Sequence, residues 1–85
     1  MRQQKEFVTG DLWLASALTL LLNTNPDYRV SNGKTLFIFP GDDKTYEAIS
    51  EYNGGCSLPA YQYAETIRKL KVEMLTRRQQ AGGGQ

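Results

Sequence analysis

Apolar residues concentrate near the N-terminus, in the stretch FVTGDLWLASALTLLL at residues 7–22. The unbroken apolar-rich part of this stretch, residues 12–22, is shorter than the ~20 residues that cross a bilayer. Glu6 and Asp11 precede it, where a signal peptide would carry net positive charge. A helix that is apolar on nearly all sides must be covered on nearly all sides. We therefore predict that residues 12–22 form the central, buried helix of a soluble domain.

Capping signals surround the start of this helix. Thr9 is placed to accept hydrogen bonds from the free N–H groups of the first turn, and Asp11 falls where the helix dipole favours negative charge. Val8 and Trp13 then occupy the two positions of a hydrophobic staple. Because Pro26 cannot continue a helix, we expect the helix to end in the polar segment that contains it.

A β-hairpin follows the helix. The Asn-Gly pair at residues 32–33 separates two segments rich in β-branched and aromatic residues, and a type I′ turn needs positive φ at both of its central positions. With this pair as the loop, Val30 faces Thr35 and Tyr28 faces Phe37. The turn therefore predicts the register of the hairpin as well as its existence.

The second strand of the hairpin, Leu-Phe-Ile-Phe at residues 36–39, is apolar on both faces. This pattern is typical of an inner strand that is covered on both sides. Its other edge then needs a partner. Two short segments are candidates for that third strand, residues 6–8 and residues 56–58.

Two helices are predicted after the hairpin. The first begins at Asp42 or Asp43 and runs to about Tyr52, and it buries the face that carries Tyr46, Ile49 and Tyr52. An Asn-Gly-Gly turn ends it, and a proline in the first turn opens the last helix. In the last helix four apolar residues recur at the spacing of one buried stripe: Tyr63, Ile67, Leu70 and Met74.

Together these elements predict an α+β fold with a central buried helix, a β-hairpin with a third short strand, a short helix and a long amphipathic C-terminal helix. A chain of 85 residues supplies one hydrophobic core, so we expect a single domain at residues 1–80. Residues 81–85 are expected to form a flexible, glycine-rich tail.

Composition favours a cytoplasmic protein without catalytic chemistry. Small secreted domains usually depend on disulfides, but Cys56 is the only cysteine. The chain has no histidine, so zinc ligands are too few, and Cys56 lacks the base that activates a nucleophile. We therefore predict a protein that is not an enzyme and has no catalytic, metal or cofactor site.

Two short motifs that resemble parts of ligand sites have simpler interpretations. Gly-Lys-Thr at residues 33–35 matches the end of a phosphate-binding loop, but the upstream glycine and the following helix of that motif are missing. The aspartate pair at residues 42–43 lacks the further carboxylates of a metal-dependent polymerase site. We interpret the first as a hairpin turn and the second as a helix cap.

Charge is distributed unevenly along a chain of net charge +1. Residues 59–80 contain five basic and two acidic residues, a net charge of +3, and the rest of the chain carries −2. This asymmetry is typical of a phosphate-binding surface, although the basic side chains scatter around the helix as they would on a solvated face. The candidate contacts with nucleic acid or another partner are Arg68, Lys69, Lys71, Arg77 and Arg78, with Tyr61 as a stacking surface.

Several motifs resemble those of a family of small bacterial and phage proteins that has no assigned function. They are an aromatic residue followed by Thr-x-Asp and Leu-Ala-x-x-Leu at residues 7–18, an aromatic-Asn-Gly turn at 52–54, and Arg-x-Leu-Lys at 68–71. The chain departs from the family pattern at Gly55, where an acidic residue is typical, and in the first turn of the last helix, which lacks a basic residue. The resemblance implies a phage or mobile-element context and supplies no catalytic residues.

Three functions remain open from the sequence. The first is a non-enzymatic phage or mobile-element binding module that engages nucleic acid or a nucleoprotein through the basic C-terminal helix. The second is a protein-binding inhibitor or adaptor that acts on a host factor through Val72, Leu75 and exposed tyrosines. The third is a structural subunit that assembles with copies of itself. The first is our leading hypothesis.

Overall fold

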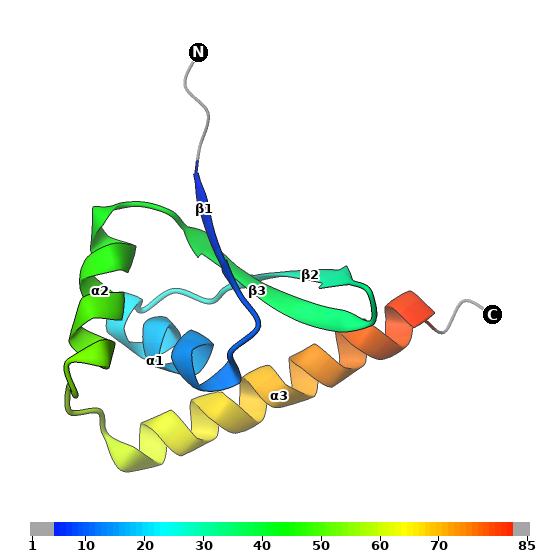
Figure 1. The fold of residues 1–85 in the computed structure, drawn as a ribbon. Coiled ribbons are helices and arrows are strands. Elements are labelled where there is room, and N and C mark those ends of the chain that lie inside the picture. The colour runs from blue at the N-terminus through cyan, green and yellow to red at the C-terminus, as the bar shows by residue number, and fades with distance from the viewer. Residues whose placement is uncertain (1–4, 83–85) are drawn as a thin grey trace.

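The computed structural model describes residues 5–82 and confirms the predicted α+β fold (Figure 1). In chain order its elements are β1 (Glu6–Thr9), α1 (Leu12–Leu22), β2 (Asp27–Ser31), β3 (Lys34–Pro40), α2 (Asp43–Asn53) and α3 (Ala60–Gly82). α3 includes the first two residues of the expected tail, and the last three residues of that tail lie outside the described range. Within residues 5–82, no helix has both the length and the apolar composition needed to cross a membrane.

β3 is the central strand of an antiparallel sheet in the order β1-β3-β2. The hairpin of β2 and β3 has the predicted register, with Tyr28 opposite Phe37 and Val30 opposite Thr35. Both residues of the connecting turn, 32–33, have positive φ, which is why an Asn-Gly pair is favoured there. The hairpin prediction is therefore confirmed.

The third strand is β1, the earlier of the two candidate segments, and residues 56–58 form no strand. β1 pairs with β3 along its whole length, and the Gly41 amide continues the pairing by donating a hydrogen bond to the Lys5 carbonyl at 2.9 Å. A Cβ atom on Gly41 would lie only 3.1 Å from the carbonyl carbon of Lys5. Glycine therefore permits the close approach of the two backbones at this point.

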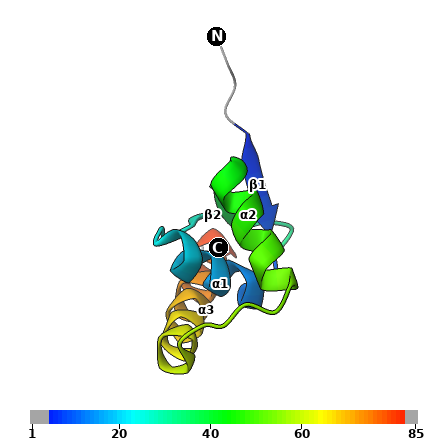
Figure 2. The same ribbon diagram turned by 90° about the vertical axis from the view of Figure 1, so that its left-hand side faces the viewer.

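The core lies between the sheet and the helices, with α1 at its centre. α1 packs between α2 and α3 (Figures 1 and 2). Ala15 and Leu18 of α1 are completely buried, in one cluster with Phe37 and Phe39 of β3 and Leu70 of α3. The apolar stretch near the N-terminus therefore forms the predicted central helix, but burial is complete only at residues 15–18, and Trp13 is exposed.

The cap of α1 differs from the prediction. Asp11, not Thr9, is the N-cap, and its carboxylate accepts hydrogen bonds from the amides of Trp13 and Leu14 at 2.9 and 3.2 Å. The Thr9 hydroxyl accepts instead from the Asp11 amide at 3.1 Å. Thr9 cannot begin the helix because its pairing with β3 still holds it in β1.

The predicted hydrophobic staple is wrong for the same reason. When the cap moves from residue 9 to residue 11, Val8 and Trp13 no longer occupy the staple positions. Trp13 is 58% exposed. Its ring packs edge-on against Tyr63 of α3, with 6.3 Å between ring centres, so it connects α1 to α3 at the surface.

α2 has the predicted position, but its buried face is shifted toward Thr45 and Ala48, with Ile49 of the predicted face partly buried against the core. Asp42 is its N-cap and accepts a hydrogen bond from the Thr45 amide at 3.1 Å. The buried residues are Thr45 and Ala48, because α2 packs against α1 through small side chains. Tyr46 was expected in the core but is half exposed at the rim of the fold, where its ring packs edge-on against Phe7 of β1.

Candidate nucleic-acid interface on the C-terminal helix

α3 carries the predicted contact residues, and three of its residues fix its position. Leu70, in the middle of the helix, is buried in the core. Nearer the start, the Tyr63 hydroxyl donates a hydrogen bond to the Trp13 carbonyl at 2.9 Å. Nearer the end, the Thr35 hydroxyl of β3 donates to the Met74 carbonyl at 2.8 Å. The helix is thus held along the fold as far as Met74, and its last turns extend past the hairpin (Figure 1).

Two of the five predicted cations already have carboxylate partners. Arg68 Nη1 lies 2.6 Å from Glu65 Oε2, and Arg77 Nε lies 3.2 Å from Glu73 Oε1. Both ion pairs are exposed and lie within one helix, so each contributes only about 0.3–0.5 kcal/mol to stability. Their main consequence for binding is that a carboxylate partly cancels the charge of each arginine.

Arg77 also takes part in the packing between α3 and the sheet. Its guanidinium carbon lies 4.7 Å from the ring centre of Tyr28 on β2, which is a cation–π contact. Burial raises the pKa of Tyr28 and Glu73 raises it further, whereas Arg77 acts in the opposite direction. Tyr28 therefore stays neutral at physiological pH beneath Arg77. Because Arg77 is held by both Tyr28 and Glu73, it is less available to an incoming phosphate than a free arginine.

The other three predicted cations, Lys69, Lys71 and Arg78, are exposed and form no ion pair within residues 5–82. Lys71 and Arg78 are seven positions apart, so they lie on the same flank of α3. Lys69 lies on the opposite flank, in a groove that Tyr28 and Arg77 also line. The five cations therefore do not form one stripe, and α3 presents positive charge on both flanks.

Tyr61 lies far from the C-terminal arginines. It is 76% exposed near the start of α3, which suits a stacking surface. Its position in the sequence places it about 25 Å from Arg78 along the helix axis, at about 1.5 Å per residue. The structure therefore does not bring these two predicted contacts into one compact site, and only a ligand that follows the helix would reach both.

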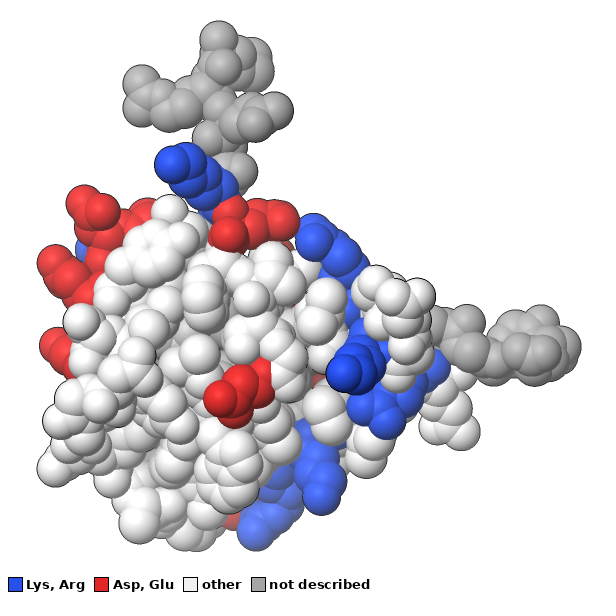
Figure 3. Space-filling view, in the orientation of Figure 1, with Lys and Arg blue, Asp and Glu red and all other residues white. Residues whose placement is uncertain are grey.

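Lys34, which the sequence did not suggest as a contact, is exposed at the end of the hairpin that lies beside α3. It is the first residue of β3, and its neighbour Thr35 is bonded to Met74 of α3, so the end of the hairpin lies beside the C-terminal half of the helix. Nothing in the local sequence indicates this placement, because it depends on a contact between residues 39 positions apart. Basic side chains accordingly gather over α3 and the end of the hairpin (Figure 3).

Acidic side chains gather on the other side of the molecule, over α2 (Figure 3). α2 and its N-cap contribute four of them: Asp42, Asp43, Glu47 and Glu51. The separation of acidic from basic groups is therefore a property of the folded molecule, produced by the placement of α2 and α3 at opposite sides of α1. In the described part of the chain, no three His, Cys, Asp or Glu side chains gather closely enough to hold a metal ion.

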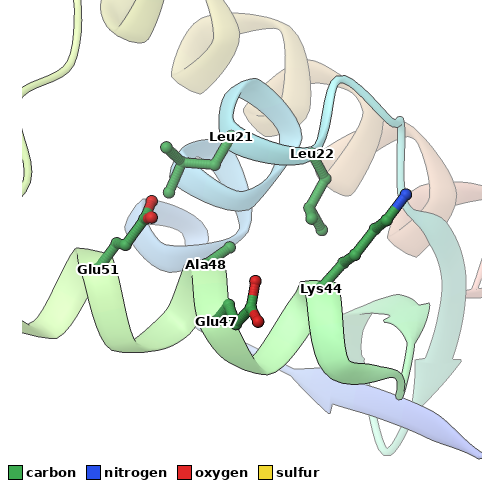
Figure 4. Close-up of a pocket in the computed structure, with 6 residues that line it drawn as sticks. All are labelled: Leu21, Leu22, Lys44, Glu47, Ala48 and Glu51. Atoms are coloured by element: carbon green, nitrogen blue, oxygen red, sulfur yellow. The ribbon is translucent and has the colours of Figure 1, made fainter.

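A shallow cavity of about 310 Å³ lies on the acidic side, between α1 and α2 (Figure 4). Its lining residues are Leu21, Leu22, Lys44, Glu47, Ala48 and Glu51. The leucines and the alanine form an apolar floor, and the charged side chains stand around it (Figure 4). The lining contains no nucleophile paired with a base. The cavity is therefore a shallow, mainly acidic depression and not a candidate catalytic site.

No protein-family model, curated protein or solved structure matches this chain. The resemblance to small bacterial and phage proteins therefore remains a prediction that depends on its motifs. Function has to be inferred from where the fold places charged, aromatic and apolar side chains.

Proposed function

We propose that this protein is a non-enzymatic module that binds nucleic acid through α3 and the adjoining end of the hairpin. The observation that carries the proposal is the separation of charge, with acidic side chains over α2 and basic side chains over α3 and the hairpin end (Figure 3). A net charge of +1 attracts phosphate weakly, whereas a local positive surface attracts it strongly. The phage or mobile-element context implied by the motifs, and a cytoplasmic location, agree with this function.

Three cations are best placed for phosphate contacts. Lys71 and Arg78 share one flank of α3 and have no ion pair in the described chain, and Lys34 lies at the hairpin end beside this helix. Contacts of this kind position nucleic acid without reading its bases, so we expect binding with little sequence preference. Arg68 and Arg77 should contribute less, because each is paired with a glutamate.

A protein partner is the second candidate, because apolar side chains on α3 are uncovered. Tyr61, Val72 and Leu75 are all exposed, and their spacing places them on one side of the helix, opposite the buried Leu70. An exposed apolar stripe is typical of a surface that packs against another protein. Affinity capture with and without nuclease distinguishes the two candidates. Protein capture that resists nuclease and is lost in Val72→Asp favours the second.

Matched charge-loss variants test the proposed nucleic-acid surface. Lys71→Gln combined with Arg78→Gln removes two positive charges from α3, and Lys5→Gln combined with Lys44→Gln removes two from other parts of the molecule. Fluorescence anisotropy with labelled single- and double-stranded DNA and RNA at low salt measures the affinity of each variant.

The first pair of substitutions should weaken binding at least about tenfold, because two phosphate contacts are lost. The control pair should change affinity by no more than about twofold, through the general loss of positive charge. Equal losses in both double variants, or no binding by the wild-type protein to any of the four nucleic acids, would contradict the proposal.

A further inference from the structure

A groove lies between α3 and the segment of chain that enters β2, on the flank of the helix that carries Lys69. Its volume is about 310 Å³, which is at the small end of the range for ligand-binding sites. Pro26 and the buried Leu70 supply apolar surface, and polar and charged side chains stand beside them. A ligand that fits this lining is small and combines an apolar surface with polar or charged groups.

Arg77 is held in this groove with one face of its guanidinium covered. The guanidinium carbon lies 4.7 Å from the ring centre of Tyr28, and Nε donates a hydrogen bond to Glu73 Oε1 at 3.2 Å. The Tyr28 ring is itself supported by Phe37 of β3, with 5.7 Å between ring centres. The side chain of Arg77 is nevertheless 47% exposed. The guanidinium therefore offers its outer face as a planar surface whose orientation is already fixed, and such a surface stacks well against other flat groups.

Lys69 supplies a positive charge near this surface. Because Arg77 reaches back to Glu73, its guanidinium lies about one turn of α3 from the level of Lys69, which is about 6 Å at about 1.5 Å per residue. Lys69 is exposed and forms no ion pair within residues 5–82. Two cations and one carboxylate leave the groove with a net positive charge. It therefore combines a platform for a flat group with a site for an anion one turn away.

We propose that this groove binds one unpaired nucleotide of a nucleic-acid strand, with its base stacked on Arg77 and its phosphate at Lys69. This assignment rests on the proposed function and specifies the form of nucleic acid that the protein prefers. Proteins commonly stack unpaired bases on arginine guanidinium planes. A base inside a duplex is already stacked on both faces, so it cannot occupy this position. Strands with unpaired nucleotides should therefore bind more tightly than blunt duplexes.

A nucleotide matches the groove better than simpler ligands do. Inorganic phosphate would contact Lys69 but would leave the planar face of Arg77 unused. An apolar peptide would bury the charged groups of the groove without giving them partners, which is costly. Asn25 also lines the groove, and its side-chain amide can both donate to and accept from the edge of a base. An amide with both capacities suits any of the bases, in agreement with binding that has little sequence preference.

Three substitutions test this assignment. Arg77→Lys keeps the positive charge but removes the planar group on which the base stacks. Lys69→Gln removes the other positive charge of the groove. Lys71→Gln is the matched control, because it removes the same charge from the opposite flank of α3. NMR titration with adenosine monophosphate measures binding to the groove alone, fluorescence anisotropy compares an oligothymidylate strand with a blunt DNA duplex, and circular dichroism checks that each variant is folded.

Adenosine monophosphate should shift the ring resonances of Tyr28 and the side-chain amide resonances of Asn25 in the wild-type protein. Arg77→Lys and Lys69→Gln should each raise the dissociation constant for the mononucleotide and for the single strand at least about fivefold. Lys71→Gln should change mononucleotide binding by no more than about twofold. Arg77→Lys should leave duplex binding unchanged, because the positive charge is retained.

The assignment is overturned if the mononucleotide shifts neither set of resonances, or if Lys71→Gln weakens its binding as much as Lys69→Gln does. It is equally overturned if Arg77→Lys leaves single-strand binding unchanged or weakens single-strand and duplex binding alike. The proposed function survives any of these results as long as Lys71→Gln combined with Arg78→Gln still weakens duplex binding. A wild-type protein that binds no nucleic acid would overturn both proposals.

Discussion

Tyr63 offers a sharp test of how α3 is joined to the core. Its hydroxyl donates a hydrogen bond to the Trp13 carbonyl at 2.9 Å, and its ring packs edge-on against the Trp13 ring. Tyr63→Phe removes the hydrogen bond and keeps the ring contact. The Trp13 carbonyl is not left without a partner, because it is also placed for the regular backbone bond within α1.

The expected cost follows from these contacts. Loss of one hydrogen bond to a carbonyl that keeps another partner should lower the free energy of unfolding by about 1 kcal/mol. In a chain of this length, that loss corresponds to a decrease in Tm of roughly 4–8 °C. Thermal and urea unfolding followed by circular dichroism measure both quantities. Tyr61→Phe is the matched control, because Tyr61 is exposed and its hydroxyl makes no hydrogen bond in the described structure.

The Tyr63 hydroxyl also makes the free energy of unfolding depend on pH in the alkaline range. Burial, followed by hydrogen bonding with Tyr52, raises the pKa of Tyr63 from 10.0 to about 12. Because the folded protein favours the neutral phenol, the contribution of Tyr63 to the free energy of unfolding is complete below pH ~10, the pKa of an unfolded tyrosine. It is lost as the pH rises through about 12. Tyr63→Phe should therefore lose less stability than the wild-type protein between these two pH values.

Two results would refute this reasoning about Tyr63. One is a Tyr63→Phe variant that is as stable as Tyr61→Phe at neutral pH, which would mean that the hydroxyl contributes nothing to the fold. The other is an alkaline titration, followed by tyrosinate absorbance, in which Tyr63→Phe leaves the step of highest pKa unchanged.

Three further substitutions test the packing around the sheet. Leu18→Ala should lower the free energy of unfolding by about 3 kcal/mol in urea titrations, because Leu18 is completely buried and the cavity cannot close fully. Thr35→Val keeps the side-chain shape but removes the bond to Met74, so we expect a loss of about 1 kcal/mol and faster amide exchange at the end of α3. Gly41→Ala should cost about 1–2 kcal/mol and shift the amide resonances of β1, whereas Gly10→Ala, where a Cβ makes an ordinary contact at 3.6 Å, should not.

Local patterns predicted the elements that depend on neighbouring residues. The apolar-rich run at residues 12–22 identified the central helix, because a segment this apolar must pack against several neighbouring elements. The Asn-Gly pair fixed both the turn and the register of the hairpin, since only a tight turn with positive φ joins two strands there. The stripe centred on Leu70 likewise identified the buried side of the last helix.

Features that depend on tertiary contacts were missed or left open. The choice between the two candidate third strands depends on which segment the fold brings beside β3, and no local pattern indicates that β1 is the one. The cap of the first helix moved to Asp11 because strand pairing holds Thr9. The pairing of Arg68 and Arg77 with glutamates follows from their i,i+3 and i,i+4 spacing within the helix, whereas the position of Lys34 beside α3 depends on how the helix and the hairpin pack.

The salt dependence of nucleic-acid binding by the wild-type protein tests the proposed function most directly. If Lys34, Lys71 and Arg78 each neutralise one phosphate of duplex DNA, the logarithm of the binding constant should fall with the logarithm of salt concentration with a slope of about −3. A slope near zero, or no binding at low salt to duplex or single-stranded DNA or RNA, would contradict the proposal.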